Sequence, residues 1–81
     1  MKTDYFYYAV LQVDENDKEI SFVLRVNDTL NLVHLFDQYK AVNPYKTKKE
    51  ALEVANLWNK WSVENNRYLF NRQYPARVFD A

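Results

Sequence analysis

Residues 47–64, TKKEALEVANLWNKWSVE, constrain the fold more strongly than any other part of the sequence. Thr47 and Glu50 have the spacing of a capping box, in which each side chain bonds the backbone N–H of the other residue, so they predict the start of a helix. At about 100° per residue, an apolar stripe with Trp58 near its centre runs along one face of this helix. The stripe consists of Ala51, Val54, Ala55, Trp58 and Trp61. Such a stripe has to be buried, so the rest of the chain must supply an apolar surface.

The chain contains no glycine, so positions that need a positive φ fall to Asn or Asp. Asn65 and Asn66 follow the predicted helix, and we expect an Asn in the left-handed conformation to end it. The polar segment 14–18, DENDK, predicts a turn in which Asn16 and Asp17 suit unusual φ values.

Two segments ahead of the helix have the composition of β-strands. Residues 5–13, YFYYAVLQV, are aromatic and β-branched with apolar side chains on both faces, which is typical of a central strand. In residues 19–26, EISFVLRV, apolar side chains alternate with a more polar set, which predicts a half-buried strand. With the turn at 14–18 between them, these strands predict a β-hairpin that supplies the apolar face.

The remaining segments predict shorter elements. Asn27 and Asp28 are good N-cap residues ahead of a short helix at about 29–38. Residues 40–45 contain a proline, which an edge strand tolerates because it needs fewer backbone donors. Residues 67–70, RYLF, are a further candidate strand.

The resulting order is β-β-α-(β)-α-(β), in which parentheses mark the two short candidate strands. It predicts a small single-domain α+β sandwich, with an N-terminal antiparallel β-hairpin packed against a C-terminal amphipathic helix. A chain of 81 residues is consistent with a single domain, which we assign to residues 1–70. Residues 71–81 show no periodicity, so we expect a C-terminal tail that is loosely docked or disordered.

Composition argues against several chemistries. Without cysteine the chain forms no disulfide or thiolate metal site, and without glycine it has no glycine-rich phosphate loop. His34, the only histidine, lies in the apolar run LVHLF and is interpreted as a packing residue. His34 and Asp37 would give two metal ligands, where hydrolytic zinc sites use at least three from the protein. We therefore expect a protein that is not an enzyme and has no metal or cofactor.

The sequence also lacks the patterns of a membrane or secreted protein. No apolar run approaches the roughly 18 residues that span a bilayer. The N-terminus does not show the charged, apolar and small-residue regions of a signal peptide in order. We expect a soluble, cytoplasmic protein without membrane contact.

Charge divides the sequence into two halves. Residues 1–37 hold three Lys/Arg and seven Asp/Glu, and residues 38–81 hold eight and four, so the formal charges are −4 and +4. The basic residues around or beyond the start of the predicted helix are Lys46, Lys48, Lys49, Lys60 and Arg67. They form a candidate surface for phosphate or nucleic acid, because a helix N-terminus favours anions. Thr47 and Glu50 oppose this use, because they already satisfy the free N–H groups there.

Two further groups of side chains are candidates for binding. Asn56 and Asn59 are expected on the outward face of the helix, where they could offer amides to bases, although acids on the same face would repel phosphate. Tyr5, Tyr7 and Tyr8 could stack single-stranded bases. The same exposed tyrosines would also serve as anchors in a protein interface.

Four stretches of the sequence, YYAV, NLVHLFDQYKAVN, TKKEALEVANLWN and NNRYLF, together resemble a group of small uncharacterised proteins from Gram-positive bacteria, their phages and integrated mobile elements. That group tends to read T-K-K-x-A-x-x-I-A-x-x-W-N and then N-G-x-Y-L-F. The matching residues are Thr47, Lys48, Lys49, Ala51, Ala55, Trp58, Asn59, Tyr68, Leu69 and Phe70. Val54 replaces the usual Ile, and Asn66 replaces the usual Gly. The resemblance covers roughly residues 7–70 and implies a mobile-element setting.

These observations lead to two hypotheses about function. The first is a non-enzymatic protein-binding module, such as a phage or mobile-element modulator of the anti-defence inhibitor type, whose partner is a host or defence protein. The alternative is a nucleic-acid-binding accessory protein that uses the basic start of the helix, which predicts binding that weakens steeply with salt. The sequence names no partner and leaves the oligomeric state open.

Overall fold

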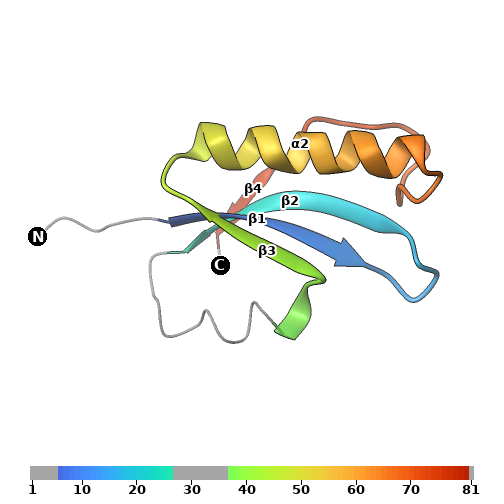
Figure 1. Ribbon diagram of the computed structural model, residues 1–81, viewed down its shortest axis with the longest axis horizontal. Coiled ribbons are helices and arrows are strands. Elements are labelled where there is room, and N and C mark those ends of the chain that lie inside the picture. Colours follow the sequence, from blue (N-terminus) through green and yellow to red (C-terminus); the bar gives the residue numbers. More distant parts are fainter. Residues whose placement is uncertain (1–5, 27–36, 81) are drawn as a thin grey trace, which may run out of the picture.

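The structure, a computed structural model, describes residues 6–26 and 37–80 and shows a small α+β fold (Figure 1). Its elements are β1 (Phe6–Val13), β2 (Glu19–Val26), β3 (Ala41–Tyr45), α2 (Lys48–Glu64) and β4 (Val78–Asp80). The strands form one mixed sheet in the order β3-β1-β2-β4, and α2 lies over one face of it. The α+β class is confirmed. The short helix expected at about 29–38 falls mainly on residues 27–36, which lie outside the described ranges.

The expected β-hairpin is confirmed. β1 and β2 pair antiparallel over their whole lengths, from Phe6 opposite Val26 to Val13 opposite Glu19. In the connecting turn, one carboxylate oxygen of Asp14 accepts hydrogen bonds from the N–H groups of Asn16 and Lys18, both at 2.8 Å. Asp17 has a φ of 63°, so an Asp takes the position that glycine would usually fill.

The expected edge strand is also present. β3 pairs antiparallel with β1 at one edge of the sheet, and Pro44 lies opposite Tyr8. Proline lacks an N–H group and therefore cannot donate a hydrogen bond to a neighbouring strand, which is tolerated at an edge because one side of the strand needs no partner. Its presence in β3 agrees with the place of this strand at the edge.

The C-terminal end of α2 follows the sequence prediction, and its start follows half of it: among the described residues, the Thr47 side chain caps the helix but the Glu50 side chain forms no return hydrogen bond to the N–H of Thr47. Thr47 has extended backbone angles, and its hydroxyl accepts a hydrogen bond from the N–H of Glu50 at 3.2 Å. At the other end Asn66 has a φ of 57°, and the N–H of Arg67 bonds the carbonyl of Ser62 at 2.8 Å. This bond is the outer one of a Schellman motif, which stops the helix and turns the chain.

The sheet has a buried layer on each face. Toward α2, Ala9 and Val23 pack against Ala51 and Ala55, and none of the four side chains is exposed. On the opposite face the buried residues are Tyr8, Val10, Leu24 and Val26, with Phe22, Tyr39 and Val42 packed against them. α2 therefore covers the more polar of the two faces of β2.

The centre of the buried stripe on α2 differs from the expected one. The buried residues of the helix are Ala51, Ala55, Asn59 and Ser62. Asn59, expected to face outward, is 1% exposed, whereas Trp61, expected in the stripe, is 51% exposed. Trp58 is partly buried at the flank of the stripe. Small alanine side chains allow the closest approach of helix and sheet, so the bulky Trp58 and Trp61 lie beside the line of closest contact.

The C-terminal segment contributes a strand that no sequence pattern indicated. We expected residues 71–81 to be a loosely docked or disordered tail, and the structure places β4 within them. β4 pairs in parallel with β2, and Nε of Arg25 forms an ion pair with the carboxylate of Asp80 at 2.7 Å. A strand of three residues is too short to show alternation, so its pairing depends on the surroundings that β2 provides.

The candidate strand at residues 67–70 is reduced to one bridge. Tyr68 forms a single parallel bridge to Glu19 at the start of β2. The chain then leaves the sheet and returns alongside α2 to reach β4 (Figure 1). β2 is therefore bordered on its outer side by two separate pieces of chain.

Candidate functional site

The outer edge of β2 is paired with the backbone of the C-terminal segment at two separate points. At its start the N–H of Glu19 bonds the carbonyl of Arg67 at 2.6 Å, and further along the N–H of Val23 bonds the carbonyl of Arg77 at 2.9 Å. Between these two points the chain bulges away from the strand. A side chain from α2 fills the place that the backbone of a neighbouring strand would take.

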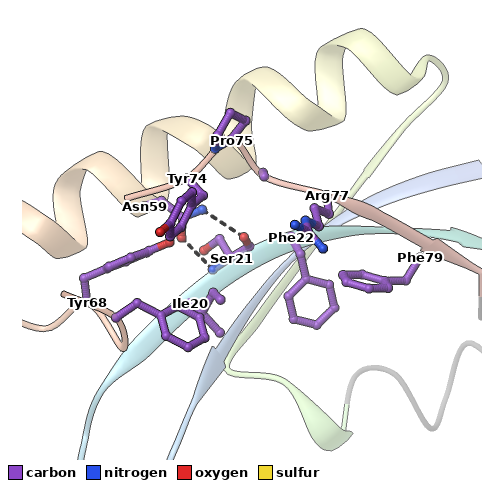
Figure 2. A pocket seen from close by; sticks show the side chains of 11 residues that line it. Ile20, Ser21, Phe22, Asn59, Tyr68, Tyr74, Pro75, Arg77 and Phe79 are labelled. Carbon is purple, nitrogen blue, oxygen red and sulfur yellow. Dashed lines mark hydrogen bonds between the residues drawn. The ribbon is translucent and has the colours of Figure 1, made fainter. Parts of the chain in front are cut away.

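That side chain is Asn59. Its Oδ1 accepts a hydrogen bond from the N–H of Ser21 at 2.7 Å, and its Nδ2 donates to the carbonyl of Ser21 at 2.9 Å (Figure 2). The amide thus acts as a substitute for a peptide group and satisfies both backbone groups of a buried residue. It also fixes the position of α2 along β2.

Asn56, one turn earlier on α2, holds the bulge itself. Its Oδ1 accepts a hydrogen bond from the N–H of Ala76 at 2.7 Å, and its backbone carbonyl accepts one from the side chain of Gln73 at 3.5 Å. Two neighbouring Asn residues therefore anchor the strand and the bulge to the same helix.

The bulge encloses a pocket of about 370 Å³, which we call the edge pocket. Its lining consists of Ile20, Ser21, Phe22, Asn59, Tyr68, Phe70, Tyr74, Pro75, Ala76, Arg77 and Phe79. Figure 2 shows Tyr68 on one side of Ser21, and Phe22 and Phe79 on the other. The rings of Phe22 and Phe79 pack edge to face with centroids 5.4 Å apart. The pocket is thus walled mainly by aromatic rings, with the Ser21–Asn59 pair at its inner side.

Many of the aromatic side chains around the edge pocket remain open to solvent. Phe70 is 52% exposed, Tyr74 55% and Phe79 49%. Exposed aromatic side chains that gather around a hollow are typical of interaction sites, because burying them on a partner gains apolar contact area.

A second hollow, of about 520 Å³, lies near the C-terminal end of α2 and is more polar. Its main feature is Glu19, which is 1% exposed. The Glu19 carboxylate lies 3.4 Å from the hydroxyl of Ser62, which also donates to the carbonyl of Trp58 at 3.0 Å, and 3.7 Å from Nζ of Lys40. These partners compensate the buried charge, so we interpret the group as a structural contact between sheet and helix.

The tyrosines proposed for stacking do not form a platform. Tyr5 lies outside the described residues. Tyr7 packs against the core on the α2 side, and Tyr8 is 6% exposed in the core of the opposite face. Burial raises the pKa of the Tyr8 phenol above its usual value of 10.0. Since Tyr7 and Tyr8 are used in two different cores, they are poorly placed to stack bases together.

The proposed basic surface is divided along α2. Lys46, Lys48 and Lys49 are exposed around the start of the helix, Lys60 is exposed in its last third, and Arg67 follows its end. A 17-residue helix is about 25 Å long, at about 1.5 Å per residue. The structure therefore brings only the three lysines at the helix start together.

The edge pocket was not recognised from the sequence, although a signal was present. Between residues 67 and 79 the sequence contains five aromatic or proline ring residues, three arginines and no acid. Binding residues are found disproportionately on irregular segments at the surface, so this segment was a candidate binding surface. The lack of periodicity in this segment indicated a tail instead.

Other kinds of site find little support in the described part of the chain. Within residues 6–26 and 37–80, no three His, Cys, Asp or Glu side chains lie close enough to hold a metal ion. The same residues include no helix long and apolar enough to cross a membrane. No protein-family model matches the sequence, and no curated protein and no solved structure matches it. The site is therefore interpreted from its own residues.

Proposed function

We propose that this chain is a non-enzymatic protein-binding module and that the edge pocket is its contact surface. The observation that supports this most strongly is the cluster of half-exposed aromatic side chains, Phe70, Tyr74 and Phe79, around a hollow with a rigid inner wall. Aromatic residues are frequent among the side chains that dominate the energy of protein interfaces.

The hydrogen bonds beneath the pocket favour a preformed site. Asn59 holds β2 and Asn56 holds the bulge, so the aromatic side chains are carried by a segment that is already positioned. Preorganisation reduces the entropy that is lost when a partner binds.

The kind of partner follows from the sequence resemblance. Small proteins of phages and mobile elements in Gram-positive bacteria fit a role as modulators of a host or defence protein, and we propose this role in the cytoplasm.

A pulldown from a Gram-positive lysate, with and without nuclease, tests the proposed function. The tagged wild-type chain is compared with the Phe70→Ala/Tyr74→Ala variant, which removes two exposed walls of the edge pocket. The control is Leu57→Ala/Trp61→Ala, which removes two exposed apolar side chains from the outer face of α2. We expect the wild-type chain to capture one dominant protein, and nuclease treatment should not remove it. The Phe70→Ala/Tyr74→Ala variant should fail to capture this protein, whereas the Leu57→Ala/Trp61→Ala control should still capture it.

Two other outcomes count against the proposal in different ways. If only the Leu57→Ala/Trp61→Ala control fails to capture the protein, the contact surface lies on the outer face of α2 and not at the edge pocket. Recovery of nucleic acid, with all proteins removed by nuclease, would favour the nucleic-acid alternative, which the exposed Lys46, Lys48 and Lys49 support. Salt titration of the captured complex then separates a phosphate-driven interaction from an apolar one.

A further inference from the structure

We infer that the edge pocket receives an aromatic or large aliphatic side chain from an acidic peptide segment, whose carboxylates pair with Arg77 in the pocket lining and with Arg72, which lies between the lining residues Phe70 and Tyr74 in the sequence. This inference rests on the proposed function and goes beyond it by naming the chemistry of the partner. It follows from the charge around the pocket, the shape of its walls and the distance to the other basic residues.

Charge is the first argument. Residues 67–79 contain Arg67, Arg72 and Arg77 and no Asp or Glu, so the segment that forms most of the pocket has a formal charge of +3. Asp80, the next acid along the chain, is paired with Arg25. Across the described ranges, no carboxylate forms an ion pair with Arg72 or Arg77. An acidic partner would complement this surface, which steers association and fixes orientation.

The shape of the pocket is the second argument. Its volume of about 370 Å³ lies within the range of about 300–1,000 Å³ that is usual for binding clefts. The rings pack edge to face, both for Phe22 with Phe79 and for Tyr68 with Phe70. Rings arranged in this way enclose a space for one apolar side chain and do not provide a row of parallel faces for successive bases.

The distance between the edge pocket and the lysines at the start of α2 favours a peptide over a nucleic acid as the partner. Single-stranded nucleic acid is usually held along a continuous basic groove with stacking side chains. Lys48 precedes Asn59 by eleven residues on α2, which places the lysines at the helix start about 16 Å from the pocket at about 1.5 Å per residue. The chain also has a formal charge of zero, whereas nucleic-acid-binding domains are usually basic. These features favour a short peptide contact.

Selection from a randomised peptide library on the full-length chain tests this inference. We expect the wild type to enrich peptides that place Trp, Phe, Tyr or Leu beside Asp and Glu. The Arg72→Glu/Arg77→Glu variant reverses two of the three positive charges in the segment 67–79, which forms most of the pocket, so we expect it to enrich Lys and Arg in place of the acids. The backbone carbonyl of Arg77 accepts a hydrogen bond from β2, so substitutions at this residue require a check of the fold. Circular dichroism provides that check for each variant.

Affinity for the best selected peptide gives the quantitative test. Reversing one charge at the rim with Arg77→Glu should weaken binding about tenfold. The matched control, Lys48→Glu, makes the same change of charge at the exposed start of α2, about 16 Å along the helix from Asn59, and should leave affinity within about twofold, because surface charges farther apart than about 8 Å are largely screened at physiological salt.

Several outcomes would overturn the inference. They are the absence of enrichment over a mock selection, enriched peptides without an acidic bias, equal effects of Arg77→Glu and Lys48→Glu, and displacement of the peptide by a short oligothymidylate. If one of these occurs while the lysate protein is still lost with Phe70→Ala/Tyr74→Ala, the proposed function stands and only the acidic partner is rejected. If that variant keeps the lysate protein, the pocket itself is rejected.

Discussion

The two halves of the interface between α2 and the sheet are built from different chemistry. In the N-terminal half, Ala51 and Ala55 pack on Ala9 and Val23, and the contact is apolar and close. In the C-terminal half, Asn59 and Ser62 meet Ser21 and Glu19, and all four of these polar residues are buried.

The difference between the two halves separates stability from position. Apolar contacts depend on area and tolerate small sliding movements, whereas paired hydrogen bonds require one arrangement. The apolar half therefore holds the helix on the sheet, and the polar half fixes where the helix and the bulge lie along β2. The edge pocket lies beside the polar half, where hydrogen bonds fix the positions of the helix and the bulge relative to β2.

Asn59→Ala breaks the polar half and should have the largest effect. It leaves the N–H and carbonyl of Ser21 unpaired in a buried place, and we expect a loss of about 3 kcal/mol in the free energy of unfolding. A domain of this size has only about 3–5 kcal/mol in total, so the variant should be close to unfolding. Urea denaturation followed by circular dichroism measures the change.

Ser21→Ala is the matched control for this prediction. The Ser21 hydroxyl is buried and has no hydrogen-bond partner among the described residues. Its removal leaves the backbone pair with Asn59 intact, so the free energy of unfolding should change by less than about 0.5 kcal/mol. Equal losses in the two variants would contradict the role assigned to the amide.

Ala55→Leu breaks the apolar half and should have the next largest effect. Ala55 is completely buried at the closest contact of α2 with the sheet, and a larger side chain there should lower the free energy of unfolding by about 2 kcal/mol.

The two halves should also respond differently to trypsin under native conditions. Arg72 and Arg77 are exposed in the folded chain, so the rate of cleavage after them reports how far the backbone around them loosens. Asn59→Ala should increase this rate, and Ala55→Leu should increase it much less. Faster cleavage at these arginines in Ala55→Leu than in Asn59→Ala would oppose the division of roles.

Substitution of the two tryptophans sharpens the same comparison at the flank of the helix. Trp58 is partly buried, and Trp58→Ala should cost about 2 kcal/mol, which is less than a fully buried tryptophan would lose. Trp61 is half-exposed, and Trp61→Ala should cost less than about 1 kcal/mol. Thermal melts of both variants measure the difference. A larger loss of stability for Trp61→Ala than for Trp58→Ala would instead support the stripe expected from the sequence, in which Trp61 is buried.

The pH dependence of stability gives the smallest predicted effect. Burial raises the pKa of Tyr8 in the folded state above its ordinary value of 10.0, so the fold favours the neutral phenol. This contribution is complete below pH 10 and is lost as the pH rises through the folded pKa. Tyr8→Phe cannot ionise, so above pH 10 the wild type should lose stability faster than the variant. Parallel losses in denaturation curves from pH 9 to 11 would contradict this.

The features that could be predicted from the sequence are local ones. The cap at Thr47, the positive φ of Asn66 and Asp17, and the hairpin each depend on residues close together in the sequence, and the edge position of β3 was indicated by Pro44 alone. Short-range hydrogen bonds and steric limits decide such features, so a short stretch of sequence is enough to indicate them.

The features that could not be predicted depend on contacts between distant residues. The helical period placed Trp58 at the centre of the stripe because large apolar side chains dominate such a pattern, but the sheet meets α2 along its smallest side chains. Asn59 resembled a surface residue because its partner, Ser21, is 38 residues away. β4 and the edge pocket exist only because β2 offers an unpaired edge to a segment without any period of its own.

The most direct test of the account is site-specific photo-crosslinking in a nuclease-treated Gram-positive lysate. One chain carries a photo-reactive phenylalanine in place of Tyr74, at the edge pocket, and another carries it in place of Leu57, on the outer face of α2. Protein binding at the edge pocket predicts one dominant protein adduct from position 74 and none from position 57. An adduct from position 57 alone, or no protein adduct from position 74, would contradict it.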